Sequence, residues 1–229
     1  RLRRLLVPFW LGDRRVERIG DLGYAPGAGR RHHLDVYRPR GGVSDAPVLV
    51  QIHGGAWLVG TKRQQGRPLM NRMAAAGWVC VAINYRLAPG TKMPGQIVDV
   101  KAALAWVHEH VADYGGDPDR VVLTGGSAGG HLAAFAALTM NDPEFQPGFE
   151  DSDTSVVAAV PVYPPTDLLA MFRFRTEFDT RWAGHAASLV FDATPTEDPA
   201  RYRAWSPIER VAGPGVPQLV VQGSADNLV

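Results

Sequence analysis

Short apolar runs, each bounded by turn-forming residues, recur along the chain. Two of them, Pro47–His53 and Trp78–Asn84, are almost continuously apolar, as is typical of strands that are covered on both faces of a parallel sheet. Similar runs predict three further strands, at Arg120–Thr124, Val156–Val162 and Pro217–Gly223. The pattern therefore predicts a mostly parallel sheet with two covered faces.

Segments with helical spacing of apolar residues lie between these runs. Gln64–Ala76 and Ile97–Val111 repeat apolar residues every three or four positions, and Ser127–Met140 is rich in alanine and leucine. An alternating run at Arg31–Pro39 predicts a half-buried strand that stops at a turn. Strands that alternate with helices predict an α/β fold with a doubly wound, mostly parallel sheet.

One long stretch, at about residues 163–214, has no regular pattern and carries many aromatic residues. Such a segment inside a compact α/β domain predicts a lid-like insertion or pocket wall above the sheet. We expect residues 1–229 to form a single domain. Residues 1–30 would be a basic and apolar N-terminal extension followed by the first strand.

Composition excludes some classes of partner. The 24 basic and 23 acidic residues give a net charge of +1, so no overall field would attract nucleic acid. The opening segment Arg1–Trp10 mixes basic and apolar residues, which favours a frayed terminus or a helix packed on the domain over weak association with a membrane surface. A cytoplasmic or membrane-associated location is favoured.

Cys80, the single cysteine, lies in an apolar run and is expected to be a buried structural thiol. The oligomeric state is not predicted.

The candidate nucleophile is Ser127, in the sequence Gly125–Gly129, which fits the pattern G-x-S-x-G. This segment lies between a predicted strand and a predicted helix, the context in which the pattern forms a sharp turn that exposes the serine hydroxyl. The flanking glycines permit the turn without clashes of a Cβ atom. Ala128 would offer a free amide at the start of the following helix.

A second glycine segment, His53–Trp57, follows a strand upstream of the serine. Its paired glycines would let main-chain N–H groups approach a substrate carbonyl and stabilise an oxyanion. A third candidate, Asp226, comes just after the last apolar run, at the edge where open α/β sheets bind ligands. A catalytic triad needs such a carboxylate to orient its histidine, although an isolated aspartate after a strand is often a turn residue.

Four motifs, taken in order, resemble the hormone-sensitive-lipase-like carboxylesterases and their feruloyl-esterase and deacetylase relatives. They are His53–Trp57, Asn84–Pro89, Gly115–Pro118 and Gly125–Ala133. The resemblance implies the α/β-hydrolase fold and a triad acid at Asp226. It also implies an oxyanion hole formed by amides of Gly54, Gly55, Ala56 and Ala128. The chain departs from the family pattern twice: Ala56 replaces a common third glycine, and Gly126 stands where many bacterial members have aspartate.

The position of the catalytic histidine is the open question. The α/β-hydrolase order is serine, acid, histidine, and none of the seven histidines follows Asp226. We expect the histidine to come after Val229, so that the chain is C-terminally incomplete and lacks its last strand and helix. His185 is the alternative base. The family would use His53 to order its loop, and His131 is expected to make a packing or loop contact.

The sequence therefore predicts a serine hydrolase that cleaves a small-molecule carboxylic ester through an acyl-enzyme, without a cofactor or metal. Trp57 and Leu58 are candidate substrate-binding residues, and Phe172, Phe174 and Trp182 are candidates for a pocket or for the core. Two alternatives remain open: an amidase or arylformamidase on the same scaffold, and a catalytically silent member that binds a ligand.

Overall fold

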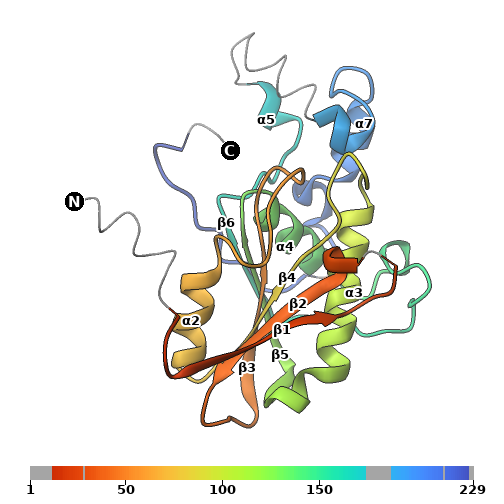
Figure 1. The fold of residues 1–229 in the computed structure, drawn as a ribbon. Coiled ribbons are helices and arrows are strands. Elements are labelled where there is room, and N and C mark those ends of the chain that lie inside the picture. The colour runs from red at the N-terminus through yellow and green to blue at the C-terminus, as the bar shows by residue number, and fades with distance from the viewer. Residues whose placement is uncertain (1–11, 28, 174–186, 214, 227–229) are drawn as a thin grey trace.

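The computed structural model describes residues 12–27, 29–173, 187–213 and 215–226 (Figure 1). Its centre is a six-stranded sheet with the strand order β1-β2-β4-β3-β5-β6. The strands are β1 (Val16–Gly23), β2 (His33–Pro39), β3 (Ala46–Ile52), β4 (Val79–Ile83), β5 (Gly116–Gly126) and β6 (Ala158–Val162). The helices are α2 (Arg67–Ala75), α3 (Gly95–His110), α4 (Ala128–Leu138), α5 (Ala170–Arg173) and α7 (Pro199–Ala204).

The sheet is mixed. Strands β4, β3, β5 and β6 pair in parallel, as the continuous apolar runs predict, whereas β1, β2 and β4 pair antiparallel. The strand predicted at 31–39 is confirmed as β2, but the prediction that it is half-buried is wrong, because β2 lies between β1 and β4 and residues 34–37 are all buried. The first strand, β1, lies within the predicted 1–30 segment.

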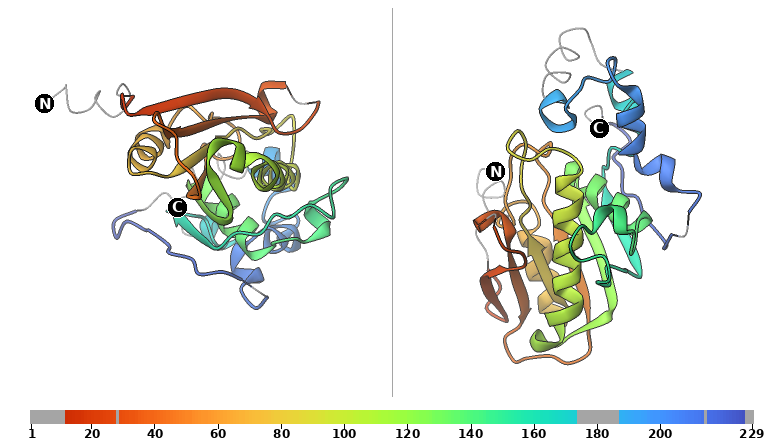
Figure 2. Two further views of the ribbon diagram at one scale, coloured as in Figure 1. Left: turned by 90° about the horizontal axis from the view of Figure 1, so that it is seen from below. Right: turned by 90° about the vertical axis from the view of Figure 1, so that its right-hand side faces the viewer.

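Helices cover both faces of the sheet, so the predicted doubly wound arrangement is confirmed (Figure 2). Met70 and Ala74 of α2 pack against a layer that includes Cys80, where burial raises the pKa of the thiol to about 12. The layer beneath α3 and α4 on the opposite face includes Val48, Val50, Val79, Val81 and Leu123. Strand side chains that alternate between two covered faces explain why the runs are apolar throughout.

The segment predicted as a strand at Pro217–Gly223 is only partly formed. It meets β6 through two isolated bridges, Ala159 with Gln218 and Val162 with Val221. The side chains of Leu219, Val220 and Val221 are 65%, 51% and 45% exposed. In the described part of the chain, no segment pairs with the side of segment 217–223 that faces away from β6. The sheet is therefore open along this last strand. Helices α5 and α7 lie above the end of the sheet at which β5 and β6 terminate (Figure 1).

A buried ionic cluster ties the segment after β3 to the antiparallel strands. Asp35 of β2 is fully buried and binds Lys62, which is 2% exposed. Asp35 also accepts hydrogen bonds from Arg18 at 2.8 Å and from the amide of Asp21 at 2.9 Å. Burial alone would raise the pKa of Asp35, but its hydrogen bonds, that of Lys62 foremost, hold the pKa below its usual range. The main-chain N–H of Lys62 donates to Asn84 at 2.7 Å, so the cluster fixes the far end of this segment.

We predict that Asp35→Asn destabilises the fold by about 3–5 kcal/mol, because Lys62 loses its buried partner. Equilibrium urea unfolding at pH 7 measures the effect, with Asp13→Asn in the exposed pair with Arg15 as the control that changes little. Since the folded-state pKa of Asp35 is lowered, its contribution is present at neutral pH and is lost as pH falls through that pKa. The unfolding free energies of wild type and Asp35→Asn should therefore converge as the pH is lowered. Equal unfolding free energies of wild type and Asp35→Asn at pH 7 would contradict the stabilising role given to Asp35.

Candidate active site

Ser127 lies on a strained turn between β5 and α4, as its motif predicts. Its backbone angles are φ 53° and ψ −123°, a region that residues with a side chain rarely occupy and that marks functional turns. The turn is held on both sides. The N–H of Ser127 donates to the carbonyl of Val162 at 3.0 Å, and the N–H of His131 donates to the carbonyl of Ser127 at 2.9 Å.

The glycines around Ser127 are required by close packing. A methyl group on Gly125 would lie 2.5 Å from the carbonyl of Gly129, and one on Gly129 would lie 2.2 Å from the carbonyl oxygen of Ile52. Cβ atoms do not approach other atoms so closely. Helix α4 can therefore begin directly against the ends of β3 and β5 only because these positions lack side chains.

The segment after β3 lies against this turn. A methyl group on Gly54 would be 2.6 Å from the carbonyl oxygen of Gly126, so the two glycine motifs meet as predicted. Three consecutive residues, Gly55, Ala56 and Trp57, have positive φ values of 121°, 51° and 59°. For Ala56 this conformation costs about 1–2 kcal/mol relative to the right-handed form. The bend must therefore be stabilised by its surroundings.

The main-chain amides of the two motifs differ in their partners. Among the four expected oxyanion donors, Gly54 is already occupied, because its N–H donates to the side-chain oxygen of Gln65 at 3.2 Å. The amides of Gly55, Ala56 and Ala128 make no hydrogen bond within the described ranges. The Gly54 amide thus has a side-chain partner, whereas the other three expected donors have none among the described residues.

His53 is locked inside the structure. Its Nδ1 is 2.8 Å from the carbonyl oxygen of Gly54, and its ring stacks on Tyr85 with centroids 4.3 Å apart. The hydroxyl of Tyr85 donates to the carbonyl of His53 at 2.9 Å. Burial lowers the pKa of His53 to about 4, so the ring is neutral at neutral pH. These contacts order the loop, which is the role that the resemblance implies.

His131 is fully buried one turn into α4. Its Nε2 lies 2.7 Å from the carbonyl oxygen of Trp205, which requires the proton to be on Nε2. Burial lowers the pKa of His131 to about 4. The ring meets Trp57 edge-on at 5.1 Å. His131 therefore joins the helix, the loop and the turn after α7, in agreement with the expected packing or loop contact.

The motif Asn84–Pro89 supports the loop from β4, a role that the sequence did not indicate. Asn84 donates to the carbonyl of Arg30 at 2.7 Å, and the N–H of Ala88 donates to the carbonyl of Trp57 at 3.0 Å. Arg86 binds the carboxylate of Asp99 on α3 at 2.6 Å. The available signal was a run of polar residues immediately after a buried strand.

A further residue at this edge was also missed. Tyr163 follows β6 with φ 37°, and its ring covers the nucleophile turn: a methyl group on Gly126 would lie 2.6 Å from the phenol oxygen. An aromatic residue after a strand has many structural uses, so the sequence alone could not assign this position.

The topology places Asp226 at the same end of the sheet as Ser127, the end at which the parallel strands terminate. Gly126 pairs with Val162, and Val162 pairs with Val221, all in parallel, so the residues that follow each strand emerge together. Asp226 lies in an exposed turn, where its N–H donates to the carbonyl of Gly223 at 3.1 Å.

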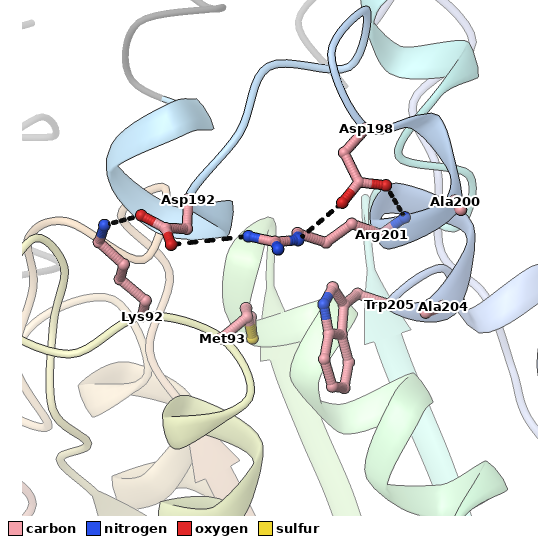
Figure 3. Close-up of a pocket in the computed structure, with 8 residues that line it drawn as sticks. All are labelled: Lys92, Met93, Asp192, Asp198, Ala200, Arg201, Ala204 and Trp205. Carbon is pink, nitrogen blue, oxygen red and sulfur yellow. Dashed lines mark hydrogen bonds and ion pairs between the residues drawn. The ribbon is translucent and has the colours of Figure 1, made fainter.

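A cavity of about 580 Å³ opens beside this edge, between α7 and the segment before α3 (Figure 3). Trp205 forms one wall, and charged residues form the rim: Lys92 binds Asp192, and Arg201 lies 3.1 Å from Asp198. The cavity therefore combines an apolar wall with two ion pairs, of which Lys92 with Asp192 joins the segment before α7 to the body of the domain and Arg201 with Asp198 lies within the α7 segment.

The two predicted substrate-binding residues lie in different environments. Trp57 is 5% exposed and packs edge-on against Phe191 at 5.5 Å, which favours a role in the core. Leu58 is half-buried. Other candidates lie outside the described residues: the side chain of Phe172, and Phe174, Trp182, His185 and residues 1–11.

The part of the chain that the structure describes contains no group of three or more histidine, cysteine or acidic residues placed to hold a metal ion. No helix in those same ranges is long and apolar enough to cross a membrane.

Comparison with curated proteins identifies close relatives. The probable carboxylic ester hydrolase LipM of Mycobacterium tuberculosis is 46% identical over 212 residues, which cover 92% of this chain and 48% of LipM. Esterase LipQ of the same organism is 45% identical over 219 residues, covering 94% of this chain and 51% of LipQ. The chain thus spans about half the length of these relatives.

Solved structures share the fold. A truncated carbohydrate esterase from gut microbiota superposes with a TM-score of 0.76 at 26% identity, over 93% of this chain and 79% of that one. Esterase B from Lactobacillus rhamnosis gives a TM-score of 0.81 at 24% identity, over 99% of this chain and 72% of that one. The family model described as BD-FAE matches residues 34–229. The chain therefore belongs to the BD-FAE family of α/β hydrolases.

Proposed function

We propose that this chain hydrolyses carboxylic esters of small molecules through an acyl-enzyme on Ser127. The observation that carries the proposal is the contact between the Gly54 loop and Gly126 on the strained serine turn. This contact supports the proposal because the loop carries main-chain amides that have no acceptor among the described residues, next to the turn of the predicted nucleophile. The names of LipM and LipQ, an ester hydrolase and an esterase, agree with this reaction.

In the proposed mechanism, the hydroxyl oxygen of Ser127 attacks the ester carbonyl and its proton passes to a histidine that Asp226 orients. The negative charge on the carbonyl oxygen is stabilised by the amides of Gly55, Ala56 and Ala128, which need no reorganisation because no acceptor in the described part of the chain occupies them. The positive end of the α4 dipole adds to this stabilisation.

The base is neither of the two histidines buried beside the turn. His53 and His131 each have one ring nitrogen against a main-chain carbonyl oxygen, and burial holds each pKa near 4. A general base works best with a pKa near the operating pH. The base that Asp226 orients is therefore a different histidine.

The substrate would lie above the edge of the sheet, beneath the segment that contains α7. We propose Leu58 as a substrate contact, because it is half-buried next to the free amides. Trp57 instead anchors the loop through Phe191 and His131. The predicted lid-like insertion stays a proposal, supported by the cavity beside α7 and its ion pairs.

We predict that Ser127→Ala in the intact protein lowers kcat for p-nitrophenyl butyrate by about 10⁶, the loss typical of a removed nucleophile. The fold should be unchanged by circular dichroism, and Ser44→Ala, in an exposed loop, should keep full activity. Mass spectrometry after fluorophosphonate treatment should find the adduct on Ser127. A Ser127→Ala variant with a tenth of the wild-type activity would rule out this nucleophile.

Resistance of the wild type to the fluorophosphonate would favour a silent ligand-binding member. Faster cleavage of formyl-anilides than of esters would favour an amidase.

A separate prediction concerns the acid. Asp226→Asn in the intact protein should lower kcat by about 10⁴, because the neutral amide stabilises the wrong tautomer of the histidine. Asp119→Asn is the matched control, since Asp119 is exposed near the start of β5, at the opposite edge of the sheet. Activity of the Asp226 variant within threefold of wild type would show that another carboxylate orients the base.

A further inference from the structure

Tyr163 occupies a strained and closely fitted position beside the nucleophile turn. Its φ of 37° is unusual for a bulky residue, and its N–H donates to the carbonyl of Val221 at 2.6 Å, which holds the bend. A methyl group on Gly126 would lie 2.6 Å from the phenol oxygen and 2.9 Å from the ring carbon that bears it. The ring fits there only because residue 126 has no side chain.

The phenol hydroxyl has no structural task in the described part of the chain. It makes no hydrogen bond there to any donor or acceptor, and the side chain is only partly buried. A strained backbone conformation that persists next to a reactive residue points to function. Here the strain places a free O–H donor at the edge of the site.

The strand order decides which part of a substrate would meet this hydroxyl. Ser127 follows β5, the loop with the free amides follows β3 on one side, and Tyr163 follows β6 on the other. If the ester carbonyl oxygen binds the loop amides, other substituents of the reacting carbon face β6. Asp226 follows the segment that pairs with the far side of β6, so the base approaches from this side too. Because the base must protonate the leaving alcohol oxygen, that oxygen lies on the side of Tyr163.

We propose that the hydroxyl of Tyr163 donates a hydrogen bond to the alcohol oxygen that leaves as Ser127 is acylated. This proposal rests on ester hydrolysis at Ser127. The bond between the carbonyl carbon and the alcohol oxygen breaks, and its electron pair moves to that oxygen. The proton that Ser127 released reaches the same oxygen through the histidine, while Tyr163 keeps its own proton. Esters of strongly basic alkoxides depend on this hydrogen bond most.

The test compares Tyr163→Phe with wild type in the intact protein, on ethyl butyrate and p-nitrophenyl butyrate. Both esters form the same acyl-enzyme, so kcat/KM isolates acylation and the leaving group. The variant should lose about ten- to hundredfold in kcat/KM on the ethyl ester, the range expected for a hydrogen bond to a developing charge. On the p-nitrophenyl ester the loss should stay within about threefold, because that leaving group is a weak base.

Tyr114→Phe is the matched control, because Tyr114 is also partly buried and lies at the opposite edge of the sheet, just before β5. It should leave both substrates unaffected. Equal losses on the two esters would assign Tyr163 a structural role, and unchanged rates on both would remove it from the reaction; either result overturns the proposal. Failure of the underlying mechanism would be distinguishable, because wild type would then form no fluorophosphonate adduct at Ser127.

Discussion

The site depends on one close approach between two backbone segments. The loop after β3 and the turn after β5 meet where a methyl group on Gly54 would come within 2.6 Å of the carbonyl oxygen of Gly126. No residue other than glycine fits at that distance. The approach brings the bend at Gly55 and Ala56 next to Ser127, and among the residues that the structure describes it leaves the amides of that bend without acceptors. A reacting carbonyl oxygen would therefore find donors already in position.

Such a contact stores strain, and the surrounding structure maintains it. Ser127, Ala56 and Trp57 all have positive φ, and unfavourable conformations of this kind persist only where their neighbours over-determine them. Stacking of His53 on Tyr85 holds the start of the loop, and the buried pair of Lys62 with Asp35 holds its end. Buried ion pairs are weak sources of stability compared with apolar packing. Their use here is consistent with a need to fix the path of the loop.

Sequence patterns predicted the parts of the fold that rest on repeated apolar burial. The central parallel strands, the covering helices and the turn at Ser127 follow from local patterns of this type. A first strand was expected within residues 1–30, but its bounds could not be predicted, because the sequence of β1, VERIGDLG, alternates poorly and contains three charged residues. The sequence also did not predict the partner of the Gly54 amide or the position of Tyr163. Both depend on distances between segments far apart in the chain, which no local pattern encodes.

The most direct test of this account is a crystal structure of the intact protein after reaction with a fluorophosphonate. The account predicts a phosphonyl group on Ser127 with one oxygen within about 2.7–3.1 Å of the amides of Gly55, Ala56 and Ala128. The Gly54 amide should remain on Gln65. An adduct on another residue, or a phosphonyl oxygen directed to solvent and away from the loop, would contradict the central claim that the contact at Gly54 builds the oxyanion site.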